Sequence, residues 1–304
     1  MFSFVKFRRI AYLFSALLLA AGIISLAVNG LNLGIDFAGG TVFHLSLGED
    51  FTLAEVKEVM ASFPELEGAS FQEVRGEQGE AGGDHGVVIK TAFVDDQRQE
   101  EIMNAFKSRW PGLNPENSRV ESVGGVVSGE LTRQALLALA VATAAMILYI
   151  SLRFEFKFAL AAIIALLHDV LIVLSVFSIL RMEINVPFVA AVLTVFGYSV
   201  NDTIVIFDRI RENIKHKRRE EYPEVVDRSI RQSLVRCFNT SLTTLLVLIA
   251  LLVGFHYFIG SLDLIVFVAA IMIGVFIGTY SSIFIASPLW LDFKEREFRR
   301  RKAF

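Results

Sequence analysis

The chain has 304 residues, 54% of them hydrophobic, and its mean hydropathy of +0.55 lies well above that of a soluble globular protein. The net charge of -3 at pH 7 excludes the strongly basic field typical of proteins that bind nucleic acid. The single Cys237 excludes an internal disulfide bond, and the Cys/His spacing of a zinc site is absent, so we expect a membrane protein with neither a metal ion nor another cofactor.

Six apolar segments are long enough to cross a bilayer, for which a helix needs about 20 residues. The first covers 10–28 and follows the basic residues Lys6, Arg8 and Arg9. Because it is longer than the apolar region of a usual signal peptide, we predict an uncleaved span. The other five predicted spans cover 134–152, 158–180, 187–207, 236–257 and 263–291.

The distribution of lysine and arginine predicts which side of the membrane each segment faces. With the N-terminus inside, the cytoplasmic pieces hold 20 of the 29 basic residues, whereas the outer loop at Arg181 holds one and the outer turn near Gly260 holds none. Long translocated domains, such as the one between the first two spans, are exempt from this rule. We therefore expect both termini in the cytoplasm and residues 31–133 on the outer side.

The sequence predicts three parts: the N-terminus with the first span (1–30), an outer α/β domain (31–133), and the remaining five spans with the C-terminus (134–304). Alternating apolar residues in the outer domain are typical of half-buried strands. The predicted strands cover 41–47, 69–74, 87–93 and 118–123. A glycine-rich acidic stretch, 76–86, is predicted to form a hairpin-like tip.

Two helices of the outer domain are expected to begin at caps. Thr52 and Glu55 have the spacing of a capping box, and Asp96 is the expected cap of the second helix. Their apolar stripes consist of Leu53, Val56, Met60 and Phe63 in the first helix, and of Ile102, Ala105, Phe106 and Trp110 in the second. The order β-α-β-β-α-β is typical of a ferredoxin-like domain, and we find no catalytic constellation in it.

Polar and ionisable residues interrupt three of the spans, and each ionisable group costs at least about 2.5–3.5 kcal/mol in the hydrocarbon core. In chain order these residues are His168 and Asp169; Tyr198, Asn201 and Asp202; and Arg236, Asn239, Thr240, Thr243 and Thr244. Those of the fourth and fifth spans recur at helical spacing and are expected to share a face of each helix. Both spans meet the same cytoplasmic loop, so an approach of Asp202 to Arg236 is geometrically allowed.

Two interpretations of this pair compete. In the structural one, Asp202 and Arg236 form a static ion pair, and the hydroxyl groups hold the helices together. In the functional one, Asp202 gains and loses a proton, and a movement of Arg236 gates the exchange because arginine keeps its own proton. One proton moving down a potential of ~100 mV supplies ~2.3 kcal/mol, so several protons suffice to drive a conformational change.

Three further features have more general interpretations. Asp169 lies at mid-membrane depth, whereas His168 is expected to point to a different face as a packed, hydrogen-bonded ring. The basic loop 209–236 indicates a topology anchor that contacts anionic lipid, or alternatively a docking surface for a cytoplasmic partner. Gly274 and Gly278 have the spacing that permits close contact between helices.

Five blocks, in order along the chain, resemble SecF-type members of the SecD/SecF family of protein-export membrane proteins. The blocks are Gly34–Gly40 (GIDFAGG), Tyr149–Glu155 (YISLRFE), His168–Val170 (HDV), Gly197–Glu212 (GYSVNDTIVIFDRIRE), and Arg236 with Asn239–Leu245 (NTSLTTL). The chain departs from the family pattern at Gly125, where proline is usual, and at Ser128, where glycine is usual. This departure affects the expected hinge before the second span.

The resemblance implies a six-span half of an RND-like transporter that pairs with SecD beside the SecYEG translocon in the inner membrane. It implies a non-enzymatic use of the proton-motive force to promote preprotein export. The implied proton-pathway residues are Asp202, Arg236, Asn201 and Thr240, with His168, Asp169, Asn239 and Thr243 in support. The implied hinge consists of Gly34, Asp36, Gly39 and Gly40, since glycine permits backbone angles that other residues avoid.

The sequence is compatible with three alternatives. Sodium could bind the carboxylate of Asp202 in place of a proton. An RND-like half that exports small molecules would require larger outer domains with a ligand-sized cleft. An intramembrane aspartyl protease would require Asp169 and Asp202 to share a proton, and their different depths argue against this.

Overall fold

The computed structural model describes residues 3–48, 51–75, 85–115, 118–217, 220–259 and 261–302. Residues 76–84 of the predicted tip and Gly260 of the predicted outer turn lie outside this part of the chain. The chain divides into two compact units, one formed by Met1–Asn32 with Leu136–Phe304 and the other by Leu33–Ala135.

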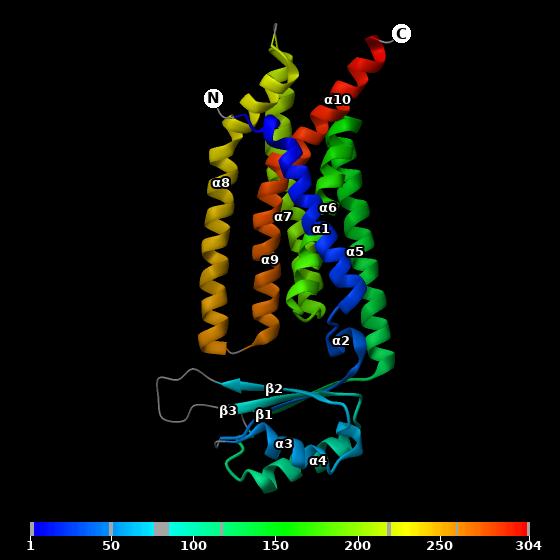
Figure 1. The fold of residues 1–304 in the computed structure, drawn as a ribbon, viewed down its shortest axis with the longest axis vertical. Helices are drawn as coiled ribbons and strands as arrows, with labels where there is room; N and C mark the ends of the chain where they lie inside the picture. Colours follow the sequence, from blue (N-terminus) through cyan, green and yellow to red (C-terminus); the bar gives the residue numbers. More distant parts are fainter. Residues whose placement is uncertain are drawn as a thin grey trace. The chain divides into compact units, whose positions relative to one another are not determined.

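The first unit is a bundle of long helices (Figure 1). They are α1 (Arg8–Asn29), α5 (Gly125–Arg153), α6 (Phe156–Leu180), α7 (Val186–Lys215), α8 (Tyr222–Gly254), α9 (Leu262–Ser281) and α10 (Ser287–Lys302). A short 3-10 turn, η1 (Val5–Phe7), precedes α1, and wide π-helical turns, η3 (Phe255–Ile259) and η4 (Ser282–Ala286), follow α8 and α9. Within the described residues, six helices are long and apolar enough to cross a membrane, which confirms the six predicted spans.

Two of these helices extend well beyond the predicted apolar segments. The fourth span was expected to end at residue 207, but α7 continues to Lys215, and α8 begins at Tyr222, before the expected 236. Apolar side chains stabilise the extensions, because Ile210 of α7 and Val226 and Ile230 of α8 are fully buried. Similarly, α5 begins at Gly125, so the expected hinge residues Gly125 and Ser128 lie in its first turn.

The centre of the bundle consists of α6, α7 and α9, whereas α1, α5 and α8 have largely exposed apolar surfaces. Close packing of α9 against α7 depends on two glycines. A Cβ on Gly274 would lie 2.1 Å from Val195 Cγ2, and one on Gly278 would lie 3.1 Å from Ser199 Cα. The predicted close contact at this pair of glycines is therefore confirmed.

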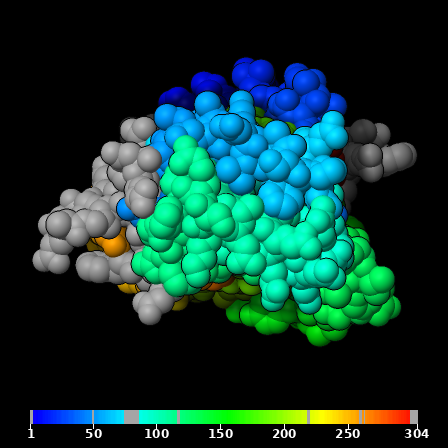
Figure 2. Space-filling model, turned by 90° about the horizontal axis from the view of Figure 1, so that it is seen from below, coloured from blue at the N-terminus to red at the C-terminus, as the bar shows by residue number. Residues whose placement is uncertain are grey.

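The second unit has a four-stranded antiparallel sheet in the order β2-β3-β1-β4. Its strands are β1 (Gly40–Ser46), β2 (Ser70–Arg75), β3 (His85–Thr91) and β4 (Arg119–Val123). The helices α3 (Leu53–Met60) and α4 (Asp96–Arg109) lie side by side over one face (Figures 1 and 2). Two short elements, α2 (Ile35–Ala38) and η2 (Pro64–Leu66), complete the unit. This arrangement confirms the predicted ferredoxin-like fold.

The helix-covered face of the sheet carries the apolar core of this unit. Phe43, Ile89 and Phe106 are completely buried there, and Trp110 stacks on Phe106 with ring centroids 5.6 Å apart. The alternation of strand residues therefore placed the core correctly. In the predicted apolar stripe of the first helix, Leu53 is an exception, because it is 38% exposed at the first position of α3.

The caps of α3 and α4 test the predicted helix starts. The Thr52 hydroxyl accepts a hydrogen bond from the Glu55 backbone, and the Glu55 carboxylate accepts one from the Thr52 backbone, so the capping box is confirmed. The predicted cap at Asp96 is wrong by one residue. Asp95 has the extended backbone that a cap requires, and its carboxylate accepts from Arg98 N at 3.0 Å, whereas Asp96 is already helical.

Candidate functional site

Asp202 of α7 is buried at the place where α7, α8 and α9 meet. Only 2% of its surface is exposed. Its Oδ2 lies 3.3 Å from the hydroxyl of Thr279 on α9 and 3.5 Å from that of Ser241 on α8. These two hydroxyl groups are themselves 2.5 Å apart. A single carboxyl group thus interacts with two neighbouring helices through small hydroxyl side chains.

Arg236 does not form an ion pair with Asp202. Its side chain is exposed on α8, and it makes no ion pair with any residue that the structure describes. The reason is helical geometry: Cys237 and Ser241 occupy the buried face of α8 that meets Asp202, and Arg236 lies about 100° away from Cys237 around the axis. The static ion pair of the structural interpretation is therefore absent from this conformation.

The expectation that Asn201 and Asp202 share a face is also wrong. The two are adjacent in α7, and Asn201 is exposed while Asp202 is buried. On α8, the hydroxyl groups of Thr240 and Thr243 donate to carbonyl oxygens of their own helix. Exposed polar residues therefore gather on the outside of these two helices. We call Asn201, Arg236, Asn239 and Thr243 the polar face of α7 and α8.

One contact between α7 and α8 does follow the predicted stripe. The Tyr198 hydroxyl donates to Thr244 Oγ1 at 3.2 Å. Thr244 in turn donates to the carbonyl oxygen of Thr240. Of the threonine hydroxyls in this stripe, Thr244 is therefore the one that joins the helices.

Asp169 of α6 forms a second buried carboxyl centre, with no exposed surface. Its Oδ2 accepts hydrogen bonds from Ser199 Oγ of α7 at 2.5 Å and from Ser281 Oγ of α9 at 2.7 Å. Its Oδ1 lies 2.9 Å from Nδ1 of His168. The expectation that His168 points away from Asp169 is wrong, because the short carboxylate stays close to the helix and the neighbouring ring turns toward it.

The other ring nitrogen of His168 has no hydrogen-bond partner among the described residues. Nε2 is buried, and the ring packs beside that of Tyr280 with centroids 6.5 Å apart. The predicted hydrogen-bonded ring is therefore confirmed for Nδ1 alone. The Tyr280 hydroxyl donates to the carbonyl oxygen of Ala11 at 3.0 Å, which connects this region to α1.

A short stretch of α9 contacts both carboxyl groups. Thr279 contacts Asp202, and Ser281 contacts Asp169. Ser282, the next residue, lies 2.8 Å from Thr203 Oγ1. The π-helical turn η4 begins at this serine, and such turns occur frequently at functional sites. The two carboxyl groups use separate hydroxyl groups, so the shared proton of an aspartyl protease finds no support here.

The prediction from sequence missed the hydroxyl residues that contact the two carboxyl groups. They are Ser199, Ser241, Thr279 and Ser281. A signal was available for two of them, since 279–282 (TYSS) is the one run of hydroxyl side chains in an otherwise apolar span. Ser199 and Ser241 are single serines beside larger polar residues, and spacing alone does not distinguish them.

The predicted hinge residues belong to the outer unit. Gly34 caps the short helix α2, which contains Asp36, and Gly39 follows that helix with φ +72. Gly40 begins β1 with φ +134, and a Cβ there would lie 2.6 Å from the carbonyl oxygen of Thr91. Both glycines therefore adopt backbone angles that other residues rarely adopt. Their role as a hinge stays a prediction.

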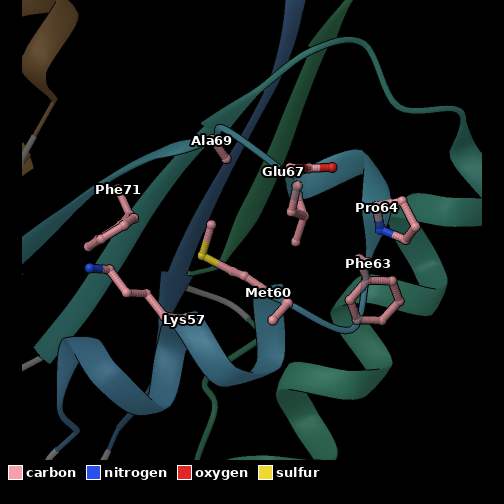
Figure 3. Close-up of a pocket in the computed structure, with 9 residues that line it drawn as sticks. Lys57, Met60, Phe63, Pro64, Glu67, Ala69 and Phe71 are labelled. Atoms are coloured by element: carbon pink, nitrogen blue, oxygen red, sulfur yellow. The ribbon is translucent and has the colours of Figure 1, made fainter.

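The outer unit also has a hollow of about 500 Å³ between α3, η2 and β2 (Figure 3). Met60, Phe63 and Phe71 contribute apolar surface to it, and Lys57 lies over the Phe71 ring with Nζ 4.9 Å from the centroid. In neither unit do the described residues contain three His, Cys, Asp or Glu side chains grouped to hold a metal ion.

Two family models match the chain. The model of the C-terminal part of protein export membrane proteins SecD/SecF matches residues 103–296, and that of the SecD/SecF GG motif matches residues 24–47. The chain belongs to the SecD/SecF family. The GG motif match includes Gly39 and Gly40, which both have a positive φ.

Curated members of the family resemble the chain over nearly its whole length. It is 37% identical to the protein translocase subunit SecF of Sebaldella termitidis, covering 94% of this chain and 89% of that protein. It is 38% identical to SecF of Vibrio alginolyticus, covering 95% and 88%. The protein translocase subunit SecDF of Bacillus subtilis is 36% identical over 99% of this chain, which spans only 39% of that longer protein.

A solved structure gives the same result. The crystal structure of SecDF from Thermus thermophilus, a translocon-associated membrane protein, matches with a TM-score of 0.82 and 35% identity. The match covers 97% of this chain and 39% of the SecDF chain. The predicted architecture of six spans with a small α/β domain after the first is thereby confirmed as that of this family.

Proposed function

We propose that this chain is an accessory subunit of the Sec protein translocase that works with a SecD partner. In this proposal it uses the proton-motive force to promote preprotein export through SecYEG across the inner membrane, with both termini in the cytoplasm. The names of its relatives support the translocase role. The proton coupling rests on one observation, the buried carboxyl group of Asp202, which forms no ion pair with a residue that the structure describes.

The surroundings of Asp202 suit either protonation state. Hydroxyl groups donate hydrogen bonds to a carboxylate and accept one from a carboxylic acid. Ser241 and Thr279 therefore stay bonded to Asp202 while the direction of the bonds changes. Because these residues belong to α8 and α9, loading and unloading of the proton acts on the packing of three helices at once.

In this proposal, Arg236 is the gate. Its guanidinium keeps its charge throughout, so an inward movement would form the ion pair that is absent here and hold Asp202 without its proton. Return of Arg236 to the exposed side of α8 would release Asp202 to accept the next proton. Asn201 and Thr240 lie on the route between these positions, and Asp169 with His168 supports α9 from the other side.

The polar face of α7 and α8 supports the pairing with SecD. Exposed polar groups are unfavourable against lipid tails and usually face another helix or an aqueous cavity. Asn201, Arg236, Asn239 and Thr243 are exposed in the isolated chain. A second membrane subunit placed against this face would shield them and enclose the route to Asp202.

The test measures preprotein export into inner-membrane vesicles with and without a proton gradient. We expect Asp202→Asn and Arg236→Ala to abolish the stimulation by the gradient while leaving gradient-independent export unchanged. Thr194→Ala is the matched control, because this exposed α7 hydroxyl bonds only its own helix, at Ala190. Full stimulation in both variants would refute the roles of carrier and gate. A sodium gradient that replaces the proton gradient would change the coupling ion alone.

A further inference from the structure

A second hollow lies at the end of the membrane-spanning unit where α7 ends and where α6 and α8 begin. We call it the helix-end groove. Its volume is about 360 Å³, and residues of α6, α7, α8 and α10 line it. This size lies within the range of about 300–1,000 Å³ that is usual for small-ligand sites. The groove is separate from both buried carboxyl groups, so its role does not depend on proton coupling.

Positive charge dominates the lining of the groove. Arg211 and Lys215 stand four residues apart on α7, which places them on the same face, and Lys294 of α10 is the third cation. Neither Arg211 nor Lys215 forms an ion pair with a residue that the structure describes, whereas Lys294 lies 3.6 Å from Glu297. The lining contains one acid, Glu155. Two uncompensated cations therefore face a hollow of ligand size.

The floor of the groove is aromatic. Trp290 is 2% exposed and stacks on Phe158 with ring centroids 4.6 Å apart. Tyr222 meets the same indole edge-on, with centroids 6.4 Å apart. Aromatic side chains at the ends of spanning helices are typical of the level where lipid headgroups lie. The position of the groove along the helices is therefore that of a headgroup.

Exposed apolar side chains stand close in sequence to Glu155, a residue that lines the groove. Leu152 near the end of α5 and Phe156 at the start of α6 flank Glu155 and are 80% and 78% exposed. The first turns of α6 and α8 also begin beside the groove, and helix N-termini carry a partial positive charge. A molecule that combines an anionic group with an apolar chain matches both parts of this surface.

We propose that the helix-end groove binds the headgroup of an anionic phospholipid. The phosphate lies between Arg211, Lys215 and Lys294, and the acyl chains extend along Leu152 and Phe156. Basic pockets between spanning helices are known to bind such headgroups. The adjoining apolar surface favours a lipid over a free phosphate ion, which has no chain to place there.

Trp290 provides the probe for the test. The chain has two tryptophans, so Trp110→Phe leaves Trp290 as the only one, with unaltered surroundings. The full chain is reconstituted in phosphatidylcholine vesicles that contain a minor fraction of a brominated lipid. This lipid is either phosphatidylglycerol or phosphatidylcholine, and in both cases the bromine lies near the headgroup. We expect brominated phosphatidylglycerol to quench Trp290 fluorescence at a lower mole fraction than brominated phosphatidylcholine. Equal quenching by the two lipids would overturn the proposal.

Substitutions then assign the preference to the groove. R211Q/K215Q should weaken it by about tenfold or more, since two of three cations are lost. R209Q/R231Q is the control, because it removes the same charge from α7 and α8 at positions that do not line the groove. An equal loss in the control would reduce the effect to general surface charge and overturn the proposal.

A variant that binds the lipid more tightly shows that the losses in the other variants do not result from misfolding. Glu155→Gln removes the one acid of the groove, and Glu155 makes no side-chain cap bond to α6, so we expect tighter binding of phosphatidylglycerol. Unchanged or weaker binding in this variant would contradict the proposal. Inorganic phosphate is added in a last arm. If it displaces the brominated lipid as effectively as unlabelled phosphatidylglycerol does, the groove is a soluble-anion site and the lipid proposal fails.

Discussion

The hydroxyl of Ser281 lies 2.7 Å from Oδ2 of Asp169, and this hydrogen bond joins α9 to α6 inside the membrane-spanning unit. Ser199 of α7 donates to the same oxygen at 2.5 Å. The helices α6, α7 and α9 thus meet at one carboxyl group. Since the carboxyl is completely buried, no water replaces a donor that is removed.

Ser281→Ala should therefore destabilise the bundle by about 1–3 kcal/mol, the usual cost of leaving a buried polar group without its hydrogen-bond partner. The measurement is the unfolding of purified protein in mixed micelles with increasing denaturing detergent. Ser287→Ala is the control, because this serine is equally buried and donates only to Ser282 O of the same helical run. Equal destabilisation by both substitutions would show that the hydrogen bond to Asp169 contributes no more stability than a bond within one helix.

Gly274 should tolerate no larger residue while Val195 faces it. A Cβ would lie 2.1 Å from Val195 Cγ2, so Gly274→Ala forces α9 away from α7 at a cost of about 1–3 kcal/mol. Val195→Ala in the same chain removes the obstructing methyl groups and should restore part of the loss. The same unfolding measurement checks both variants.

Gly197 of α7 provides the contrast to Gly274. A Cβ at Gly197 meets nothing within 4 Å, so Gly197→Ala should stabilise the helix by about 0.5–1 kcal/mol. If Gly197→Ala and Gly274→Ala change the stability of the bundle equally, close packing against Val195 does not explain the loss expected for Gly274→Ala.

Much of this architecture was predictable because it depends on patterns along the chain. Apolar length defined the six spans, and alternation with the Thr52 capping box defined the outer domain. The partners of the buried carboxyl groups were not predictable in the same way. Ser241 and Thr279 reach Asp202 because of the rotation of α8 and α9, which depends on packing. Arg236 shows the converse, since sequence spacing alone permitted an ion pair that packing does not form.

Gly40 is expected to be the most sensitive residue of the GG motif. It has φ +134, and a Cβ there would lie 2.6 Å from the carbonyl oxygen of Thr91 on the neighbouring strand β3. Gly40→Ala should therefore separate β1 from β3 at this register and destabilise the outer unit by about 1–3 kcal/mol. Trp110, buried in the core of this unit, reports its unfolding in urea by fluorescence when Trp290 is replaced by Phe.

Gly39→Ala is the matched comparison for Gly40. Gly39 also has a positive φ, +72, but a Cβ there would approach only to 3.3 Å, and its neighbour is the side chain of Ser128. We expect a smaller loss of stability than for Gly40→Ala, because a hydroxyl rotates away more easily than a strand moves. A larger loss at Gly39 would show that backbone angle, and not the contact with β3, limits this motif.

The outer unit should lose stability in acid through two glutamates. Hydrogen bonds from the backbone and hydroxyl of Thr52 hold the pKa of Glu55 below its usual range. Bonds from its own backbone and from Arg98 do the same for the pKa of Glu65. A carboxyl with a lowered folded pKa contributes stability above its unfolded pKa of about 4.3, and loses that contribution as the pH falls through the lowered value.

The urea midpoint of Trp110 fluorescence should therefore be constant near neutral pH and fall below about pH 4. Glu55→Gln should lower the midpoint at neutral pH, because the bonds to the carboxylate are lost. It should also make the decline in acid shallower, because glutamine does not titrate and so adds no pH dependence to the stability. Glu58→Gln, at an exposed position of the same helix, should leave the whole profile unchanged. If Glu55→Gln retains the full acid dependence, other carboxyl groups carry it, and the capping box stabilises α3 without regard to pH.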